Sequence, residues 1–128
     1  MIKVIKIPHK GRGIIATQDV HQGTQLEVAP VSILPKEQVP SINKTEIFKY
    51  YFVQPLEYEK SNHTKAYLVF GLASLCNHAD NPNAHIEWTE DDIGLWSHLL
   101  AKRDIEKGEE VTLFYTNIDE YAHTDQFI

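Results

Sequence analysis

The chain has 128 residues, of which 42% are hydrophobic and 23% charged, and this favours one globular domain over two domains or a disordered chain. Its formal net charge of −6 argues against nucleic acid as a partner, because phosphate binding depends on Lys and Arg. Its single cysteine, Cys76, excludes an internal disulfide framework and a cysteine-based zinc cluster.

Two related segments predict strand–turn–strand corners towards the two ends of the chain. Residues 16–26 read ATQDVHQGTQL and residues 101–111 read AKRDIEKGEEV, with alanine, aspartate and glycine in register. The glycines, Gly23 and Gly108, suit a turn with a left-handed backbone. Two copies are too few for a solenoid, which needs at least three stacked units. The segments therefore predict two similar corners in one β-rich domain.

Between these corners the sequence predicts one helix. Asn43 is placed to cap it, Glu46 occupies the capping-box position, and Pro55 would end it. Its apolar stripe would comprise Ile47, Phe48, Tyr51 and Phe52. The preceding residues 30–40 contain three prolines, which argue against a long strand there.

Alternation predicts two further strands in the second half of the chain. Apolar and polar residues alternate over 84–88, as in a strand with one buried face. Val111, Leu113 and Tyr115 would likewise share one face of a strand. Together with the corners, these patterns predict a mainly β domain with little helix.

Three short segments contain residue types that suit a binding or catalytic site. Residues 11–13, Gly-Arg-Gly, would let the backbone approach a ligand, or would simply form a hairpin turn. Residues 75–84, LCNHADNPNA, follow an apolar run and alone would suit a surface loop. Residues 108–115, GEEVTLFY, end in Tyr115, which alone would be a packed strand residue.

Metal and thiol chemistry are weaker interpretations of the same segments. The histidines, His78 and His85 among them, match no common zinc spacing, so no metal site is expected. Cys76 and His78 suggest a thiol nucleophile, but closeness in sequence is not catalytic geometry.

Taken together and in this order, the three segments resemble the SET domain of protein lysine methyltransferases, in the short bacterial and viral form without flanking zinc segments. The resemblance covers nearly the whole chain and implies that residues 1–128 form a single SET domain. It implies a β-fold of several small sheets with little helix and a C-terminal pseudoknot. It also implies transfer of a methyl group from S-adenosylmethionine to the side-chain amine of lysine in a protein. The alternative is a catalytically inactive SET-fold module that binds a protein.

The resemblance also implies roles for individual residues. The cofactor-binding positions would be Gly11, Arg12, Gly13, Asn77 and His78. Asn77 would act through its side chain, and His78 mainly through its backbone. Tyr115 would be catalytic, and Leu113 and Tyr121 would line the substrate channel. Leucine at 113, where the family often has Phe or Tyr, would leave room for products beyond monomethyl-lysine.

This chain departs from the family pattern at several positions. Ala79 and Asp80 replace the usual Ser-Cys, and Phe114 replaces the acidic residue that often precedes the catalytic tyrosine. The tail, residues 116–128, would close the lysine channel without zinc, with Tyr121 or Phe127 as its aromatic wall.

The expected partner is a lysine-bearing protein, and the acidic residues around 87–92 and 106–110 are either solvated faces or a surface that attracts a basic substrate. A homodimer is compatible with the sequence. The longest nearly apolar run, residues 66–76, is too short to span a bilayer, and the N-terminus lacks the apolar block of a signal peptide. We therefore expect no membrane partner and an intracellular protein, cytoplasmic or, in a eukaryote, nuclear.

Overall fold

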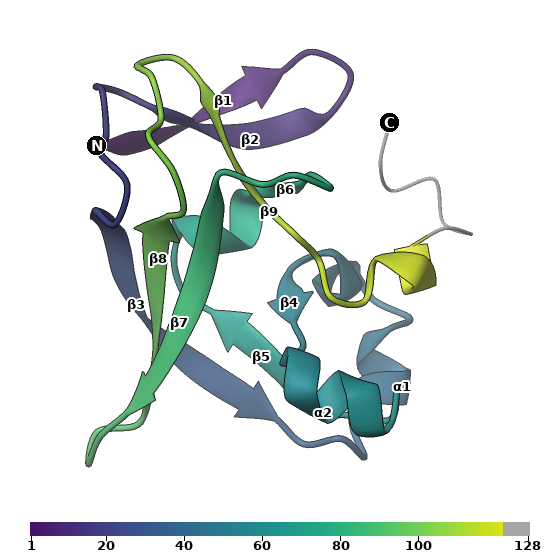
Figure 1. Cartoon of the computed structure of the whole chain (residues 1–128). Helices are drawn as coiled ribbons and strands as arrows, with labels where there is room; N and C mark the ends of the chain where they lie inside the picture. Colours follow the sequence, from purple (N-terminus) through teal and green to yellow (C-terminus); the bar gives the residue numbers. More distant parts are fainter. Residues whose placement is uncertain (122–128) are drawn as a thin grey trace.

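The computed structural model describes residues 1–121, and most of their regular structure is β-strand. One sheet has four strands in the order β1 (Ile2–Ile7), β2 (Gly11–Ala16), β9 (Glu110–Leu113) and β6 (Asn77–His78). The other has five in the order β4 (Tyr51–Phe52), β5 (Ala66–Val69), β3 (Gln25–Leu34), β8 (Leu95–Ala101) and β7 (Ala84–Glu90). In Figure 1, β1 and β2 lie across the top of the molecule and the larger sheet extends below them. The predicted mainly β fold with several small sheets is confirmed.

Alternation along the strands explains which side chains form the core. In β8, Ser97, Leu99 and Ala101 are buried, and in β9 Val111 and Leu113 are buried. Successive strand side chains point to opposite faces, so each of these strands covers the core with one face only. The strand predicted from alternation over 84–88 is confirmed as the first five residues of β7.

The two related segments, 16–26 and 101–111, form similar corners and pair with each other. Val20 and Ile105 exchange two backbone hydrogen bonds, of 2.8 and 2.9 Å. Gly23 and Gly108 both have φ of +87°, a conformation that a residue with a Cβ rarely adopts. The prediction of two strand–turn–strand corners is therefore confirmed.

The helix predicted from Asn43 is wrong. The chain instead forms α1 (Val39–Ile42), a single 3-10 turn η1 (Glu46–Lys49) and then β4. Thr45 caps the turn, because its hydroxyl oxygen accepts the Ile47 N–H at 3.3 Å. Tyr51 and Phe52 pair with β5 as strand β4. Local helix signals do not predict this pairing, because it depends on a strand distant in the chain.

Two prolines also behave differently from their prediction. Pro55 begins helix α2 (Pro55–Lys60) instead of ending one, because the first position of a helix needs no N–H. Strand β3 runs through Pro30 and is the longest strand of the described residues. The Phe70 N–H donates to the Pro30 carbonyl at 3.0 Å just beyond the end of β5, so the missing proline N–H removes only the last bond of that ladder.

The remaining helices are the 3-10 turns η2 (Leu72–Leu75) and η3 (Ile118–Tyr121). Within residues 1–121, no helix has both the length and the apolar character needed to cross a bilayer.

Candidate active site

The three segments singled out in the sequence meet around β9. Strand β9 pairs antiparallel with β2 on one side and parallel with β6 on the other. The parallel pairing sets Asn77 opposite Thr112 and His78 opposite Leu113. Residues far apart in the chain therefore share one sheet, as the expected pseudoknot requires.

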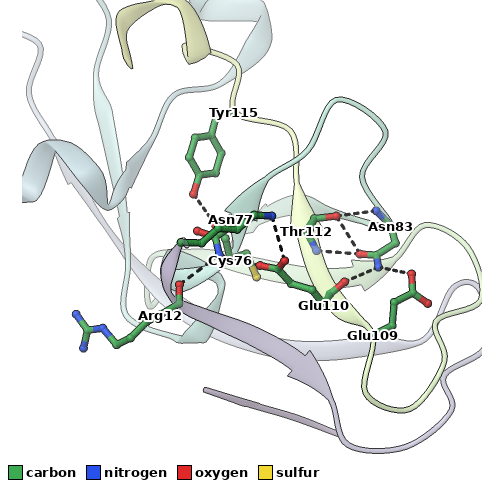
Figure 2. Close-up of polar contacts among 9 residues, drawn as sticks. Arg12, Cys76, Asn77, Asn83, Glu109, Glu110, Thr112 and Tyr115 are labelled. Carbon is green, nitrogen blue, oxygen red and sulfur yellow. Dashed lines mark hydrogen bonds and ion pairs between the residues drawn. The ribbon is translucent and has the colours of Figure 1, made fainter. Parts of the chain in front are cut away.

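The Asn77 side chain ties these segments together. Its Nδ2 donates to the Glu110 carboxylate at 2.7 Å and to the Arg12 carbonyl at 3.2 Å, as Figure 2 shows. A Cβ at Gly13 would lie 2.5 Å from Ile7 Cγ1 and 2.9 Å from Asn77 Nδ2. Only glycine therefore lets β2 lie this close to the amide of Asn77.

Asn83 holds the loop after β6 against β9. Its side chain is 2% exposed, and Nδ2 donates to the Glu110 carbonyl at 2.8 Å and to the Glu109 carboxylate at 3.1 Å. Its Oδ1 accepts the Thr112 N–H at 2.9 Å (Figure 2). Both ends of this buried amide are hydrogen-bonded, which is what makes its burial tolerable.

His78 positions the backbone of Tyr115. Its Nδ1 accepts the Tyr115 N–H at 2.9 Å, so Nε2 carries the ring proton and donates to Asp80 Oδ1 at 2.9 Å. The exposed Phe114 ring lies 4.9 Å from the imidazole. Phe114, at the position where an acidic residue often stands in the family pattern, therefore places its ring beside that of His78.

Tyr115 points its hydroxyl back into the protein. The hydroxyl donates to the Cys76 carbonyl at 2.5 Å (Figure 2). Burial, and secondarily the neighbouring Tyr121 and Cys76, raise the pKa of Tyr115 well above its ordinary value. The side chain is therefore a neutral hydrogen-bonding group at physiological pH, not a phenolate.

Cys76 is not suited to nucleophilic chemistry. Its side chain is 1% exposed, and burial raises the pKa of the thiol far above its ordinary value. A buried, protonated thiol is unreactive. Within residues 1–121, no three His, Cys, Asp or Glu side chains gather into a possible metal site.

Two pockets adjoin Tyr115. We call the first the Gly11 pocket, which is lined by Lys10, Gly11, Arg12, Lys49, Tyr50, Ser74, Leu75, Asn77, Tyr115 and Tyr121. Three of the predicted cofactor residues, Gly11, Arg12 and Asn77, line it. Gly13 and His78 do not line it. Gly13 lies against the Asn77 amide, and His78 binds the Tyr115 backbone.

We call the second the Trp88 pocket. It is lined by Tyr51, Phe52, Val53, Pro55, Pro82, Ala84, His85, Ile86, Trp88, Lys102, Leu113, Phe114, Tyr115, Thr116 and Asn117. Leu113 lines it, and Tyr115 is common to both pockets. Tyr121 lines only the Gly11 pocket, with its ring 5.6 Å from that of Tyr115 and its hydroxyl donating to the Phe48 carbonyl.

Sequence reasoning missed several residues of this site. Glu110 accepts a hydrogen bond from Asn77, and Asn83 donates one to the Glu110 carbonyl. In the sequence, the Pro-Asn pair was the only sign of Asn83. Asn117 belongs to none of the sequence motifs and is identified only because it lines the Trp88 pocket. Phe127, suggested as a wall of the lysine channel, lies outside the described residues.

Comparison with known families and proteins gives a consistent result. The family model described as SET domain matches residues 11–116. A histone-lysine N-methyltransferase specific for H3 lysine-36, from Debaryomyces hansenii, is 30% identical over 98% of this chain. A Schizosaccharomyces pombe enzyme specific for H3 lysine-37 is 28% identical over 83% of this chain and 67% of its own length. The chain spans only 17% of the Debaryomyces protein.

Solved structures agree in fold. A Plasmodium falciparum protein assigned to the histone methyltransferases superposes with a TM-score of 0.70 at 20% identity, covering 90% of this chain and 96% of that one. The Neurospora SET domain protein DIM-5, a histone lysine methyltransferase, gives a TM-score of 0.65 at 19% identity, covering 89% of this chain and 51% of that one.

Proposed function

The chain belongs to the SET-domain family, and from this premise we propose that it transfers methyl groups from S-adenosylmethionine to the side-chain amine of lysine in a protein. The observation that carries the proposal is the position of Tyr115, which lines both the Gly11 pocket and the Trp88 pocket. A cofactor in the first and a lysine entering from the second would meet at this residue.

The Gly11 pocket fits S-adenosylmethionine. Gly11 has φ of +78° and no atom within 4 Å of an added Cβ, which leaves the turn open beside the pocket. Arg12 lines the pocket and suits the cofactor carboxylate, whereas the lining residues Lys10 and Lys49 form ion pairs with Glu110 at 3.3 Å and Glu46 at 3.0 Å. Asn77 offers its amide oxygen, since its Nδ2 already donates to Glu110 and Arg12, and Tyr50 offers an aromatic ring. When bound there, S-adenosylmethionine would supply an electrophilic methyl group on a positively charged sulfur.

The residues around the Trp88 pocket would prepare the lysine. A free lysine amine has a pKa of about 10.4 and is protonated at neutral pH. Apolar walls such as Leu113 and Trp88 disfavour the charged form, and the neutral amine can then attack. The amine nitrogen would take the methyl group, leaving the bonding electron pair on sulfur, and would then release one proton to solvent.

Tyr115 would align this attack. Its hydroxyl, anchored to the Cys76 carbonyl, offers its oxygen to the incoming amine while its backbone is fixed by His78. Alignment of reacting atoms at roughly 3–3.5 Å supplies a large part of such a rate enhancement. Because the phenol stays neutral, it would orient the amine and not remove its proton.

A methyl-transfer assay with labelled S-adenosylmethionine tests this proposal. The relatives from Debaryomyces and Schizosaccharomyces are named for lysines of histone H3, so the substrate panel includes H3 beside other lysine-bearing proteins. We expect Tyr115→Phe to bind the cofactor normally and to lose at least about tenfold in turnover, about 1.4 kcal/mol of barrier. Tyr58→Phe, which lines neither pocket, is the matched control.

Two outcomes would contradict the proposal. Cofactor binding without transfer to any substrate of the panel would favour the inactive protein-binding module. Equal turnover of wild type and Tyr115→Phe would make Tyr115 a packing residue.

A further inference from the structure

The lining of the Trp88 pocket contains no carboxylate among the described residues, in a chain whose net charge is −6. Lys102 is the charged member of this lining and is exposed, whereas the side chain of His85, on the same face of β7 as Glu87, points away from the face of Ile86 and Trp88. Arg103 adds a further positive charge at the same end, because its guanidinium donates to the carbonyl of Pro82, a lining residue, at 3.1 Å. One end of this pocket is therefore cationic.

Of the seven acidic residues in segments 87–92 and 106–110, four are engaged elsewhere or point away from the pocket. Glu109 and Glu110 bind Asn83 and Asn77. Asp91 closes the β7–β8 turn by accepting three hydrogen bonds through Oδ1. Glu87 lies between two lining residues of β7, so its side chain points to the opposite face of the sheet.

Of the two carboxylates of α2, that of Glu57 is also turned away from the pocket. Glu57, two residues beyond the lining residue Pro55, accepts the Tyr67 hydroxyl through both oxygens, at 3.0 and 2.8 Å. Tyr67 does not line the Trp88 pocket.

Asn117 gives an independent sign of an acceptor-bearing ligand. It lines the Trp88 pocket and is 2% exposed, yet its Nδ2 has no hydrogen-bond partner within residues 1–121. A buried donor without an acceptor is unfavourable and calls for an explanation. A carbonyl or carboxylate oxygen of a bound chain would satisfy it.

From these two observations we infer that the Trp88 pocket selects lysines with an acidic residue beside them. Lys102, supported by Arg103, attracts the carboxylate, and Asn117 donates to an oxygen of the same chain. This inference rests on the proposed function. It differs from the expectation of a basic substrate. Positive charges of such a substrate would meet Lys102 and Arg103, and like charges at a binding site disfavour association.

Three synthetic peptides test the charge preference. They are identical except that the lysine is flanked on both sides by Glu, by Gln or by Lys, and each carries a dye at its N-terminus. We expect kcat/KM for the Glu-flanked peptide to exceed that for the Lys-flanked peptide by at least about fivefold, with a difference that shrinks at high salt. Lys102→Glu should reverse the order. Lys3→Glu, an equal charge change on β1, should preserve it.

Binding of the same peptides, followed by fluorescence polarisation, separates this inference from the proposed function. Tighter binding of the Glu-flanked peptide without turnover supports the inference and contradicts only the proposed methyl transfer. Turnover with a preference for the Lys-flanked peptide overturns only the inference. Binding of none of the three, or a preference that Lys102→Glu leaves unchanged, also overturns it.

Asn117→Leu tests the second half of the inference. We expect KM for the Glu-flanked peptide to rise about threefold to tenfold with little change in kcat. The melting temperature should not fall, because an apolar side chain of similar size replaces a buried amide whose Nδ2 is unpaired. Asn117→Asp keeps the shape and removes the donor, so it should raise KM as well. A lower melting temperature with unchanged KM in both variants would make Asn117 structural.

Discussion

Asn77 and His78 are neighbours in the chain with different contacts. The Asn77 amide bridges β2 and β9 at the edge of the Gly11 pocket, whereas the His78 ring holds the backbone of Tyr115. Under the proposed function, Asn77 would therefore contact the cofactor, and His78 would hold Tyr115 in its catalytic position.

We expect Asn77→Ala to weaken S-adenosylmethionine binding more than His78→Ala does. Loss of the partly buried amide should cost about 1–3 kcal/mol, roughly fivefold to a hundredfold in Kd. His78→Ala should lower kcat instead, because Tyr115 loses its backbone anchor. Calorimetry and turnover of the same preparations measure both effects, and the exposed Asn62→Ala is the control. Equal Kd values for the two site variants would disprove this division of roles.

Leu113 belongs both to the core and to the Trp88 pocket, with 3% of its side chain exposed. It has no hydroxyl to hold a water beside the amine, so we expect wild-type products beyond monomethyl-lysine. Leu113→Tyr should shift the distribution towards monomethyl-lysine, at a stability cost of about 1–3 kcal/mol from overpacking. Mass spectrometry of the products decides this, with a melting curve to show that the variant folds. A wild type that stops at monomethyl-lysine would refute the argument.

The two corners, residues 16–26 and 101–111, are linked by reciprocal hydrogen bonds. Asp19 Oδ1 accepts the Lys107 N–H at 2.9 Å, and Asp104 Oδ1 accepts the Gln22 N–H at 2.7 Å. Each aspartate thus fixes the turn of the other copy. The internal similarity of the sequence is the sign of this two-fold arrangement.

We expect Asp19→Ala and Asp104→Ala to destabilise the fold by similar amounts, about 1–2 kcal/mol each, since each removes a charge-assisted bond to a turn N–H. The double variant should depart from additivity, because both aspartates support the same pair of corners. Urea denaturation measures the changes, with the exposed Asp92→Ala as control. A loss in one variant only would show that the corners are not equivalent.

At the scale of the whole molecule, tyrosines link stability to high pH. Burial is the largest cause that raises the pKa of Tyr51, Tyr58, Tyr67, Tyr115 and Tyr121. For Tyr51 the pKa rises to about 12. In the unfolded chain these tyrosines ionise near pH 10, before they do in the folded state.

The free energy of unfolding should therefore be unaffected by the tyrosines below about pH 10 and should fall as the pH rises towards 12. The slope is up to about 1.4 kcal/mol per pH unit for each fully buried tyrosine and less for the others. Urea titrations at increasing pH, together with tyrosinate absorbance, measure this loss. Tyr121→Phe should reduce the slope, and an unchanged slope would contradict the assignment.

Features that depend on local order can be predicted from the amino-acid sequence alone. The three segments and their spacing, the alternation in β7 and the repeated corners are all readable because strand periodicity and turn glycines act over a few residues. The mainly β fold and the SET-domain membership follow from them.

Features that depend on partners distant in the chain are visible only in the folded molecule. Residues 51 and 52 became a strand and not a helix because β5 was available to pair with them. Tyr115 is held through the carbonyl of Cys76 and the ring of His78, residues more than thirty positions away. The cationic end of the Trp88 pocket likewise sets Lys102 and Arg103, just beyond β8, beside Pro82, just before β7. Such contacts form when chain folding brings remote residues together, and no local pattern encodes them.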